Sequence, residues 1–261
     1  MTALIATDIK NPTKPIIAVW FSCGAASAVA AYKTKQKYGH THDIRIINNP
    51  VAEEDNDNLR FMHDVSIWLG MPIECAYNSK FPNASAVEVW DKKTYMAGIE
   101  GAPCTQLLKK QARYAWEIKF KPDWHVLGFT TDEQDRHDRF VLTERDNVLP
   151  VLIEAGISKR MCFDILKDAG IRRPRIYDMG YPNANCIGCV KATSPTYWNH
   201  VRHAHPEVFQ ARADQSRRIG AKLVRHKGKR IYLDELPPDA KGRPMKTLQF
   251  ECGIFCEEDK P

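Results

Sequence analysis

The chain has 261 residues, of which 43% are hydrophobic and 27% charged, so it can bury a large core. It contains no run of about 18 apolar residues, which excludes a transmembrane helix, and its N-terminus lacks the apolar stretch of a secretion signal. We therefore expect a cytoplasmic protein with no membrane contact. The net charge of +6 suits an anionic partner, and the basic run over Arg217–Arg230 favours a solvated face over a nucleic-acid patch.

The first part of the chain alternates between strand and helix patterns. Short apolar runs predict buried strands at 14–21, 43–49, 72–77 and 124–128. Helical patterns lie between them at 28–39, 57–70 and 105–120. This alternation predicts an α/β fold with a mostly parallel, twisted sheet that has helices on both faces.

The pattern changes after residue 147. A helix is predicted to end at Gly170, the turn-rich segment 172–189 is predicted to be irregular, and a helix over Ser194–Ile219 is predicted to break at Pro206. We expect an α/β domain at 14–192. A helical and loop extension at 193–261 is expected to fold back over the sheet and its site.

Small residues follow the first predicted strand. They are Ser22, Cys23, Gly24, Ala25 and Ser27. Small side chains let the backbone approach an anion, and the N-terminus of the next helix offers N–H groups and a positive dipole end. The segment lacks the spacing and the lysine of a Walker loop. By itself it fits a phosphate-binding loop and a tight strand–helix turn equally well.

The segment PRIYDMGYPNANCIGC, at residues 174–189, places Cys186 and Cys189 behind a Tyr-Asp-x-Gly-Tyr sequence. It resembles the PLYDxGYxSIGCxxCT segment of sulfonucleotide reductases, which belong to the PP-loop (adenine nucleotide α-hydrolase) superfamily. The residues Ser22–Ser27 resemble the SGGxDS loop of that superfamily, although Cys23 replaces a glycine and Ala26 replaces the aspartate of ATP-splitting members. The resemblance implies a PP-loop, HUP-like fold that binds an adenine nucleotide on this loop, under the C-terminal extension.

Eight cysteines in a reducing compartment are not expected to form a disulfide framework. Five of them are candidates for a metal or redox site: Cys104, Cys186, Cys189, Cys252 and Cys256. The segment around Cys104 resembles the CCxxRKxxPL segment of reductases that hold a [4Fe–4S] cluster, which implies Cys104, Cys186 and Cys189 as ligands. Pro103 replaces the first cysteine of that segment. Cys252 or Cys256 is then expected to be the fourth ligand, or one iron stays open, and zinc is the alternative metal.

The C-terminal sequence around Cys252 resembles the ECG[LI]H motif of sulfonucleotide reductases. In that family the cysteine attacks the sulfur of the bound nucleotide, so the resemblance implies Cys252 as the catalytic nucleophile. Phe255 replaces the usual histidine of the motif. A second reading joins Cys252 and Cys256 with the Cys186–Cys189 pair in a four-thiolate metal site, and both readings stay open.

The segment from Gly128 to Arg139 resembles a family loop whose arginines hold phosphate and sulfate oxygens. The resemblance implies this role for Arg136 and Arg139, with Lys109 adding positive charge. Thr130 replaces the first arginine of that loop. A surface loop with solvated charges is the alternative reading.

The resemblance as a whole implies an adenylyl-sulfate or phosphoadenylyl-sulfate reductase, an oxidoreductase that releases sulfite and uses a thioredoxin-like reductant. One alternative is an ATP-dependent PP-loop sulfurtransferase that modifies tRNA or DNA through a [4Fe–4S] cluster, with nucleic acid as its partner. A second alternative is a non-catalytic, nucleotide-binding accessory protein. The sequence leaves open whether the chain forms a homo-oligomer.

Overall fold

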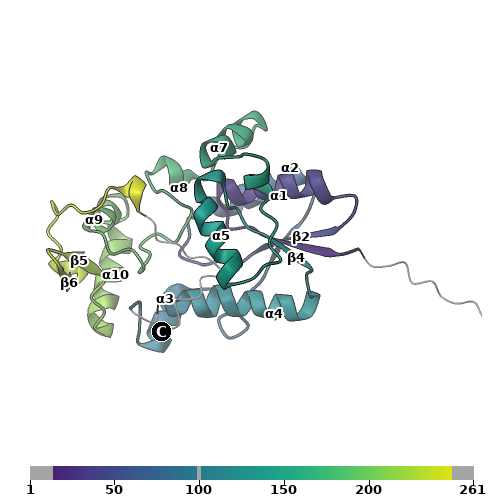
Figure 1. Ribbon diagram of the computed structural model, residues 1–261. Helices are drawn as coiled ribbons and strands as arrows, with labels where there is room; N and C mark the ends of the chain where they lie inside the picture. Colours follow the sequence, from purple (N-terminus) through teal and green to yellow (C-terminus); the bar gives the residue numbers. More distant parts are fainter. Residues whose placement is uncertain (1–13, 99–100, 249–261) are drawn as a thin grey trace, which may run out of the picture.

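The structure is a computed structural model that describes residues 14–98 and 101–248 (Figure 1). Its main sheet has four parallel strands in the order β3-β2-β1-β4. The strands are β1 (Ile16–Trp20), β2 (Asp43–Asn48), β3 (Ile73–Cys75) and β4 (Trp124–Val126). The predicted α/β class and parallel sheet are confirmed, and the arrangement is consistent with a Rossmann-like or HUP-like fold.

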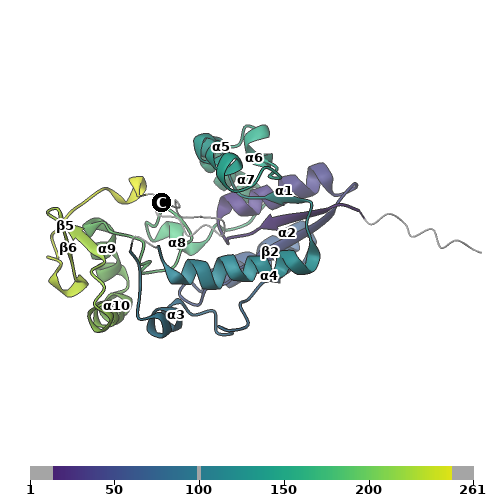
Figure 2. The same cartoon turned by 60° about the horizontal axis from the view of Figure 1, so that its bottom comes forward.

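Alternate residues of β1 pack against helices on opposite faces of the sheet. Ile17 and Val19 belong to a hydrophobic cluster on one face, whereas Trp20 packs with Trp116 of α4 (Gln111–Phe120) on the other. The first face is covered by α1 (Ala25–Tyr38), α2 (Asp57–Leu69), α6 (Val151–Glu154) and α7 (Lys159–Asp168). Figures 1 and 2 show α1 and α4 on opposite sides of the strands. Helices on both faces are therefore confirmed.

The segment predicted as one helix over 105–120 divides into two. Residues Thr105–Lys110 form a π-helix, η1, and α4 continues from Gln111 to Phe120. A π-helix bonds residue i to i+5, and such turns recur at functional sites. Lys109 belongs to this π-helix and is buried, with 6% of its surface exposed. Apolar spacing alone does not separate this arrangement from an ordinary helix, which explains the difference from the prediction.

Several elements are missing from the sequence prediction, among them two helices and a small sheet. The helix α3 (Ala86–Lys93) is capped at its N-terminus by Ser85, whose hydroxyl accepts a hydrogen bond from the Glu88 N–H. The helix α5 (Gln134–Thr143) buries only His137, so it has no apolar stripe to detect. A two-stranded sheet, β5 (Val224–His226) with β6 (Lys229–Ile231), is too short for its alternation to be visible. Short 3₁₀ helices are η2 (Thr131–Glu133), η3 (Leu233–Glu235) and η4 (Met245–Thr247).

The last part of the described chain lies beyond the carboxyl ends of the parallel strands (Figures 1 and 2). One short helix, α8 (Arg175–Asp178), interrupts the segment predicted to be irregular. The predicted break at Pro206 is confirmed, because α9 (Pro195–Ala204) ends there and α10 (Pro206–Ile219) begins. One hydrophobic cluster contains both Trp198 of α9 and Trp90 of α3. It therefore spans the predicted domain boundary between residues 192 and 193, and that boundary stays a prediction. No helix in the described ranges is long and apolar enough to cross a membrane.

Candidate functional site

A pocket opens at the carboxyl ends of β1, β2 and β4. Its wall includes residues that follow each strand, among them Ser22, Asn49 and Leu127. The connections from β1 and β4 leave the sheet in different directions, because β2 and β4 flank β1 on opposite sides. Ligands of open parallel sheets bind at such a switch point, beyond the strand ends. The pocket is therefore the candidate functional site.

The loop between β1 and α1 is closed by its own hydrogen bonds. Ser27 Oγ donates to the Gly24 carbonyl oxygen at 2.9 Å and accepts from the Ser22 N–H at 3.2 Å. The first intrahelical bond runs from the Ala28 N–H to the same Gly24 carbonyl at 3.1 Å. The earlier N–H groups of an α-helix have no intrahelical acceptor. The loop thus presents the amino end of a 14-residue helix to the pocket.

Cys23 shapes this loop through its backbone. Its φ of 55° lies in the left-handed region, which glycine adopts most readily, and the resembled loop carries glycine at this position. The side chain is 3% exposed, and its sulfur accepts a hydrogen bond from Asn48 Nδ2 at 3.5 Å. Burial, as the largest cause, raises the pKa of the Cys23 thiol well above its usual value. Cys23 therefore stays protonated at neutral pH. Its side chain is not among those that line the pocket.

Gly128, after β4, lies against the first turn of α1. A Cβ atom at Gly128 would be 2.8 Å from the Ser27 nitrogen and 3.0 Å from the Ala26 carbonyl carbon. Real side chains do not come so close to backbone atoms, so only glycine fits here without a shift of the chain. Gly24 lies near Tyr177, whose hydroxyl oxygen would lie 3.3 Å from a Cβ at Gly24.

Tyr177 of α8 connects the loop to the last part of the chain. Its hydroxyl accepts a hydrogen bond from the Ala25 N–H at 3.4 Å. Burial, as the largest cause, raises the pKa of Tyr177 to about 12, so the hydroxyl keeps its proton at neutral pH. Tyr177 lies in the segment that carries the family resemblance, but no local pattern in the sequence predicts its contact with a loop 152 residues away.

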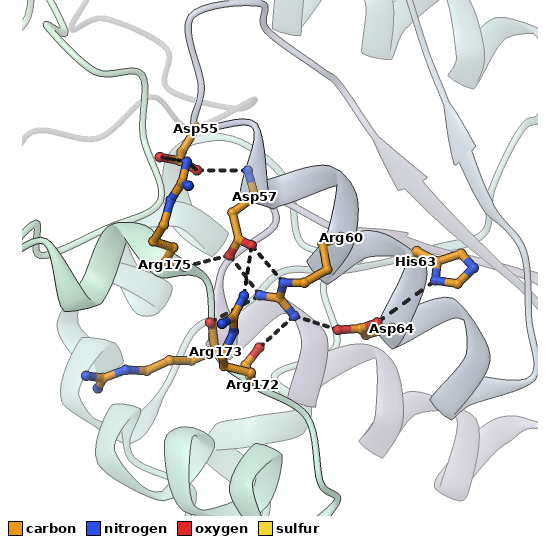
Figure 3. Close-up of polar contacts among 8 residues, drawn as sticks. All are labelled: Asp55, Asp57, Arg60, His63, Asp64, Arg172, Arg173 and Arg175. Carbon is orange, nitrogen blue, oxygen red and sulfur yellow. Dashed lines mark hydrogen bonds and ion pairs between the residues drawn. The ribbon is translucent and has the colours of Figure 1, made fainter. Parts of the chain in front are cut away.

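An ion-pair network holds the segment that leads into α8 (Figure 3). The Asp57 carboxylate accepts hydrogen bonds from Arg60 at 2.7 and 2.8 Å and from the Arg175 N–H at 2.7 Å. The Asp55 carboxylate accepts two bonds from the Arg175 guanidinium, at 2.8 and 3.0 Å. The hydrogen bonds from Arg60 are the main reason that the pKa of Asp57 falls to about 2. The network ties α2 to the residues that position Tyr177.

Among the described residues, three cationic and two anionic side chains line the pocket. Lys109 Nζ lies 3.2 Å from the Glu54 carboxylate, and the two side chains are 8% and 9% exposed. Burial raises the pKa of Glu54, and Lys109 opposes that rise. Arg136 Nη1 lies 2.7 Å from the Glu133 carboxylate. The fifth charged side chain, Lys159, is described next.

Lys159 joins the pocket to the loop that precedes the CxxC pair. Its ammonium group donates to the Pro182 carbonyl oxygen and to Asn183 Oδ1, both at 2.8 Å. Lys159, like Glu54, is a lining residue that the sequence analysis missed. Neither belongs to a recognisable motif, and both reach the pocket only because distant segments meet there. With the helix N-terminus, the charge of the site favours an anionic ligand.

The structure brings together most of the residues predicted to bind a nucleotide. Ser22, Gly24, Ser27, Lys109 and Arg136 line the pocket. Two others, Cys23 and Ala25, belong to the loop with buried side chains. Arg139 is exposed on α5 and is not among the lining residues.

The cysteines predicted to bind metal lie apart from the loop. Cys186 and Cys189 belong to the hydrophobic cluster of α9 and α10, and Cys104 packs against it. Tyr197 organises the pair, because its hydroxyl accepts from the Cys189 N–H at 2.9 Å and lies 3.4 Å from the Cys186 carbonyl oxygen. Within 14–98 and 101–248, no three or more Cys, His, Asp or Glu side chains form a group that could hold a metal ion.

The remaining predicted residues, Cys252 and Cys256, lie outside the described residues. The predicted nucleophile and the predicted fourth ligand therefore stay predictions.

No protein-family model matches the chain, and no similar curated protein is found.

Proposed function

We propose that the protein is a PP-loop enzyme that binds an adenylyl sulfate and acts as a sulfonucleotide reductase. One observation carries the nucleotide site: the amino end of α1 and the cations Lys109 and Arg136 face one pocket at the strand ends. Backbone N–H groups and paired cations are the usual ligands of phosphate and sulfate groups. The closed Ser22–Ser27 loop would hold the phosphate, and the cations would neutralise the charge that it carries.

The residue at position 26 supports a sulfonucleotide over ATP. Ala26 lines the pocket, where the ATP-splitting enzymes of the resembled superfamily carry an aspartate. Alanine offers no carboxylate to position a metal ion beside a leaving pyrophosphate. The pocket has its carboxylates at Glu54 and Glu133 instead, each beside a cation. This arrangement supports binding of an anion without cleavage between its α- and β-phosphates.

In the proposed reaction the thiolate of Cys252 attacks the sulfur of the bound adenylyl sulfate. An S–S bond forms while the S–O bond to the nucleotide breaks, and the leaving phosphate oxygen keeps the electron pair. A thiol of a thioredoxin-like reductant then attacks the Cys252 sulfur and releases sulfite. The second thiol of the reductant closes its disulfide and returns Cys252 as a thiolate.

We also propose that Cys104, Cys186 and Cys189 hold an iron–sulfur cluster, with Cys256 as the fourth ligand. Their place in or against one large hydrophobic cluster supports this. Within the described residues the three cysteines do not by themselves form a group that could hold a metal ion, so no step of the reaction is assigned to the cluster. Anaerobic purification should yield iron and sulfide, and Cys104→Ser should lose both, whereas Cys162→Ser, in a different cluster of buried residues, should keep them. Zinc without iron in the unaltered protein would overturn this part of the proposal.

Calorimetry with adenylyl sulfate, phosphoadenylyl sulfate and ATP tests the nucleotide site. We expect a sulfonucleotide to bind best and Arg136→Gln to weaken that binding by roughly 10–100-fold, the effect of losing one charge-assisted hydrogen bond. Arg139→Gln removes the same charge from the same helix outside the pocket and should change the affinity little. Sulfite release with a dithiol reductant should depend on Cys252. Turnover of ATP alone would favour the sulfurtransferase, and binding without any turnover would favour an accessory protein.

A further inference from the structure

The β5–β6 hairpin is a short two-stranded ribbon with a two-residue turn. Lys227 and Gly228 form the turn, with φ of 45° and 78°. Two positive φ values are typical of the tight turns that match the twist of paired strands. The Arg225 N–H donates to the Thr193 carbonyl oxygen at 2.9 Å, which fixes the hairpin to the segment before α9. The ribbon is thus a defined element and not a loose loop.

The hairpin carries positive charge without acidic residues. No Asp or Glu occurs between Ala221 and Leu233. The exposed basic side chains in this stretch are Lys222, Arg225, Lys227, Lys229 and Arg230. The strand register places Arg225 directly opposite Arg230, and His226 opposite Lys229. Like charges at directly opposed positions destabilise a strand pair, so this arrangement lowers the stability of the hairpin.

A second basic segment lies beside the hairpin. Its exposed side chains are Lys241, Arg243 and Lys246. The Arg243 carbonyl oxygen accepts a hydrogen bond from Ser194 Oγ at 3.2 Å, one residue from the Thr193 carbonyl that accepts from Arg225. Both segments therefore flank residues 193–194. We call these eight side chains the basic surface.

Acidic residues in the same stretch of the chain offset little of the charge of the basic surface. Residues 222–246 contain eight Lys or Arg and three Asp or Glu. Two of the three acids, Asp234 and Glu235, pair with Arg217 of α10, which lies outside that range. Arg230 Nη1 donates to the Leu223 carbonyl oxygen at 2.8 Å, a neutral acceptor that leaves its charge in place. The basic surface therefore carries a net positive charge toward solvent.

We propose that the basic surface binds the sugar–phosphate backbone of a nucleic acid. A nucleic acid supplies closely and regularly spaced negative charges, which neutralise opposed cations that repel one another in the free protein. A protein partner is less suitable, because protein interfaces have an apolar core. Of the large apolar side chains that are exposed in the described residues, none comes from 193–248. The proposal goes beyond the nucleotide site and does not depend on it.

Fluorescence anisotropy with a labelled duplex DNA and a labelled single-stranded RNA tests the proposal. Binding should weaken as salt rises from about 50 to 200 mM, with a slope of about −0.9 in log K against log salt for each phosphate contact on a duplex. Lys227→Gln/Lys229→Gln should reduce the magnitude of that slope by about 1.8. The matched control is Lys119→Gln/Lys167→Gln, which removes two exposed lysines from α4 and α7. The control should keep the slope of the unaltered protein.

Three results would overturn the proposal. They are no binding at the lowest salt, an equal loss in the control variant, and tighter binding of polyglutamate than of either nucleic acid. Calorimetry with the sulfonucleotide on both variants separates this proposal from the previous one. Nucleotide affinity should be unchanged in the hairpin variant, and circular dichroism shows whether that variant is folded. Loss of nucleic-acid binding in a folded hairpin variant is therefore the supporting result, whether or not the sulfonucleotide binds.

Discussion

The pocket and the basic surface both attract anions, but they are built in different ways. At the pocket the loop Ser22–Ser27 presents a helix N-terminus, and Lys109 and Arg136 each lie within 3.2 Å of a carboxylate. On the hairpin the cations are exposed, and Arg225 faces Arg230. A carboxylate holds a cation in one position, which suits recognition of one small anion. Opposed cations without carboxylates between them suit a polyanion that is bound through its charge alone.

Removing the Lys109 cation should have the largest effect, because it leaves the Glu54 carboxylate buried without its ion-pair partner. We expect Lys109→Met to lower the free energy of unfolding by about 3–5 kcal/mol. Urea unfolding at neutral pH measures this loss. Glu54→Gln/Lys109→Met removes both charges and should recover a large part of it. If the double variant were no more stable than Lys109→Met, the loss of stability would not come from leaving the Glu54 carboxylate without its ion-pair partner.

Gly128→Ala should have the next largest effect, because its Cβ would overlap the backbone of Ser27. We expect a loss of unfolding free energy of about 1–3 kcal/mol and weaker nucleotide binding, since the loop must shift. Gly24→Ala is the comparison, because its nearest contact is a single side-chain atom, the Tyr177 hydroxyl oxygen at 3.3 Å, and not backbone. Urea unfolding and calorimetry measure both variants. A Gly24→Ala loss equal to that of Gly128→Ala would contradict the role assigned to the close approach of the β4 connection.

Acid should weaken the attachment of α8 to the loop through Asp57. Its folded-state pKa of about 2 lies below the ordinary value of 3.8, so the network stabilises the protein above pH 3.8. That stability, about 2 kcal/mol, is lost as the pH falls from 3.8 through about 2. Asp57→Asn should remove this part of the pH dependence and should lower stability at neutral pH. The control is Asp168→Asn, at the exposed end of α7. If Asp57→Asn and the unaltered protein lost the same stability in acid, a group other than Asp57 would cause that loss.

The difference between the two regions also explains what the sequence could predict. The loop Ser22–Ser27 was recognisable because a buried parallel strand, small residues and a helix follow one another in the chain. The helix α5 was not, because only His137 is buried in it. The contacts of Glu54, Lys159 and Tyr177 with the pocket depend on segments that meet only after folding. No local pattern marks them.

The basic run over Arg217–Arg230 shows a related limit. From the sequence it favoured a solvated face, because charge runs are commonly exposed. The structure separates its members: Arg217 of α10 pairs with Asp234, whereas Arg225 and Arg230 oppose each other in the hairpin. The number of charges in this run is the same whether it forms a solvated face or a surface that binds a polyanion. Strand register decides which of these cations repel one another, and composition does not contain it.

Arg225→Glu should give the smallest change in stability and separates the two uses of charge most directly. It turns the opposed pair with Arg230 into an attractive pair, so we expect the free energy of unfolding to rise by about 0.2–1 kcal/mol. Nucleic-acid affinity should fall at the same time, because one cation is lost and one anion gained on the basic surface. Arg225→Gln should lie between the two in both measurements, and nucleotide binding should be the same in all three proteins. A more stable hairpin that binds nucleic acid less well would mean that this strand pair retains its repulsion for binding; a fall in both would mean that Arg225 contributes to folding instead.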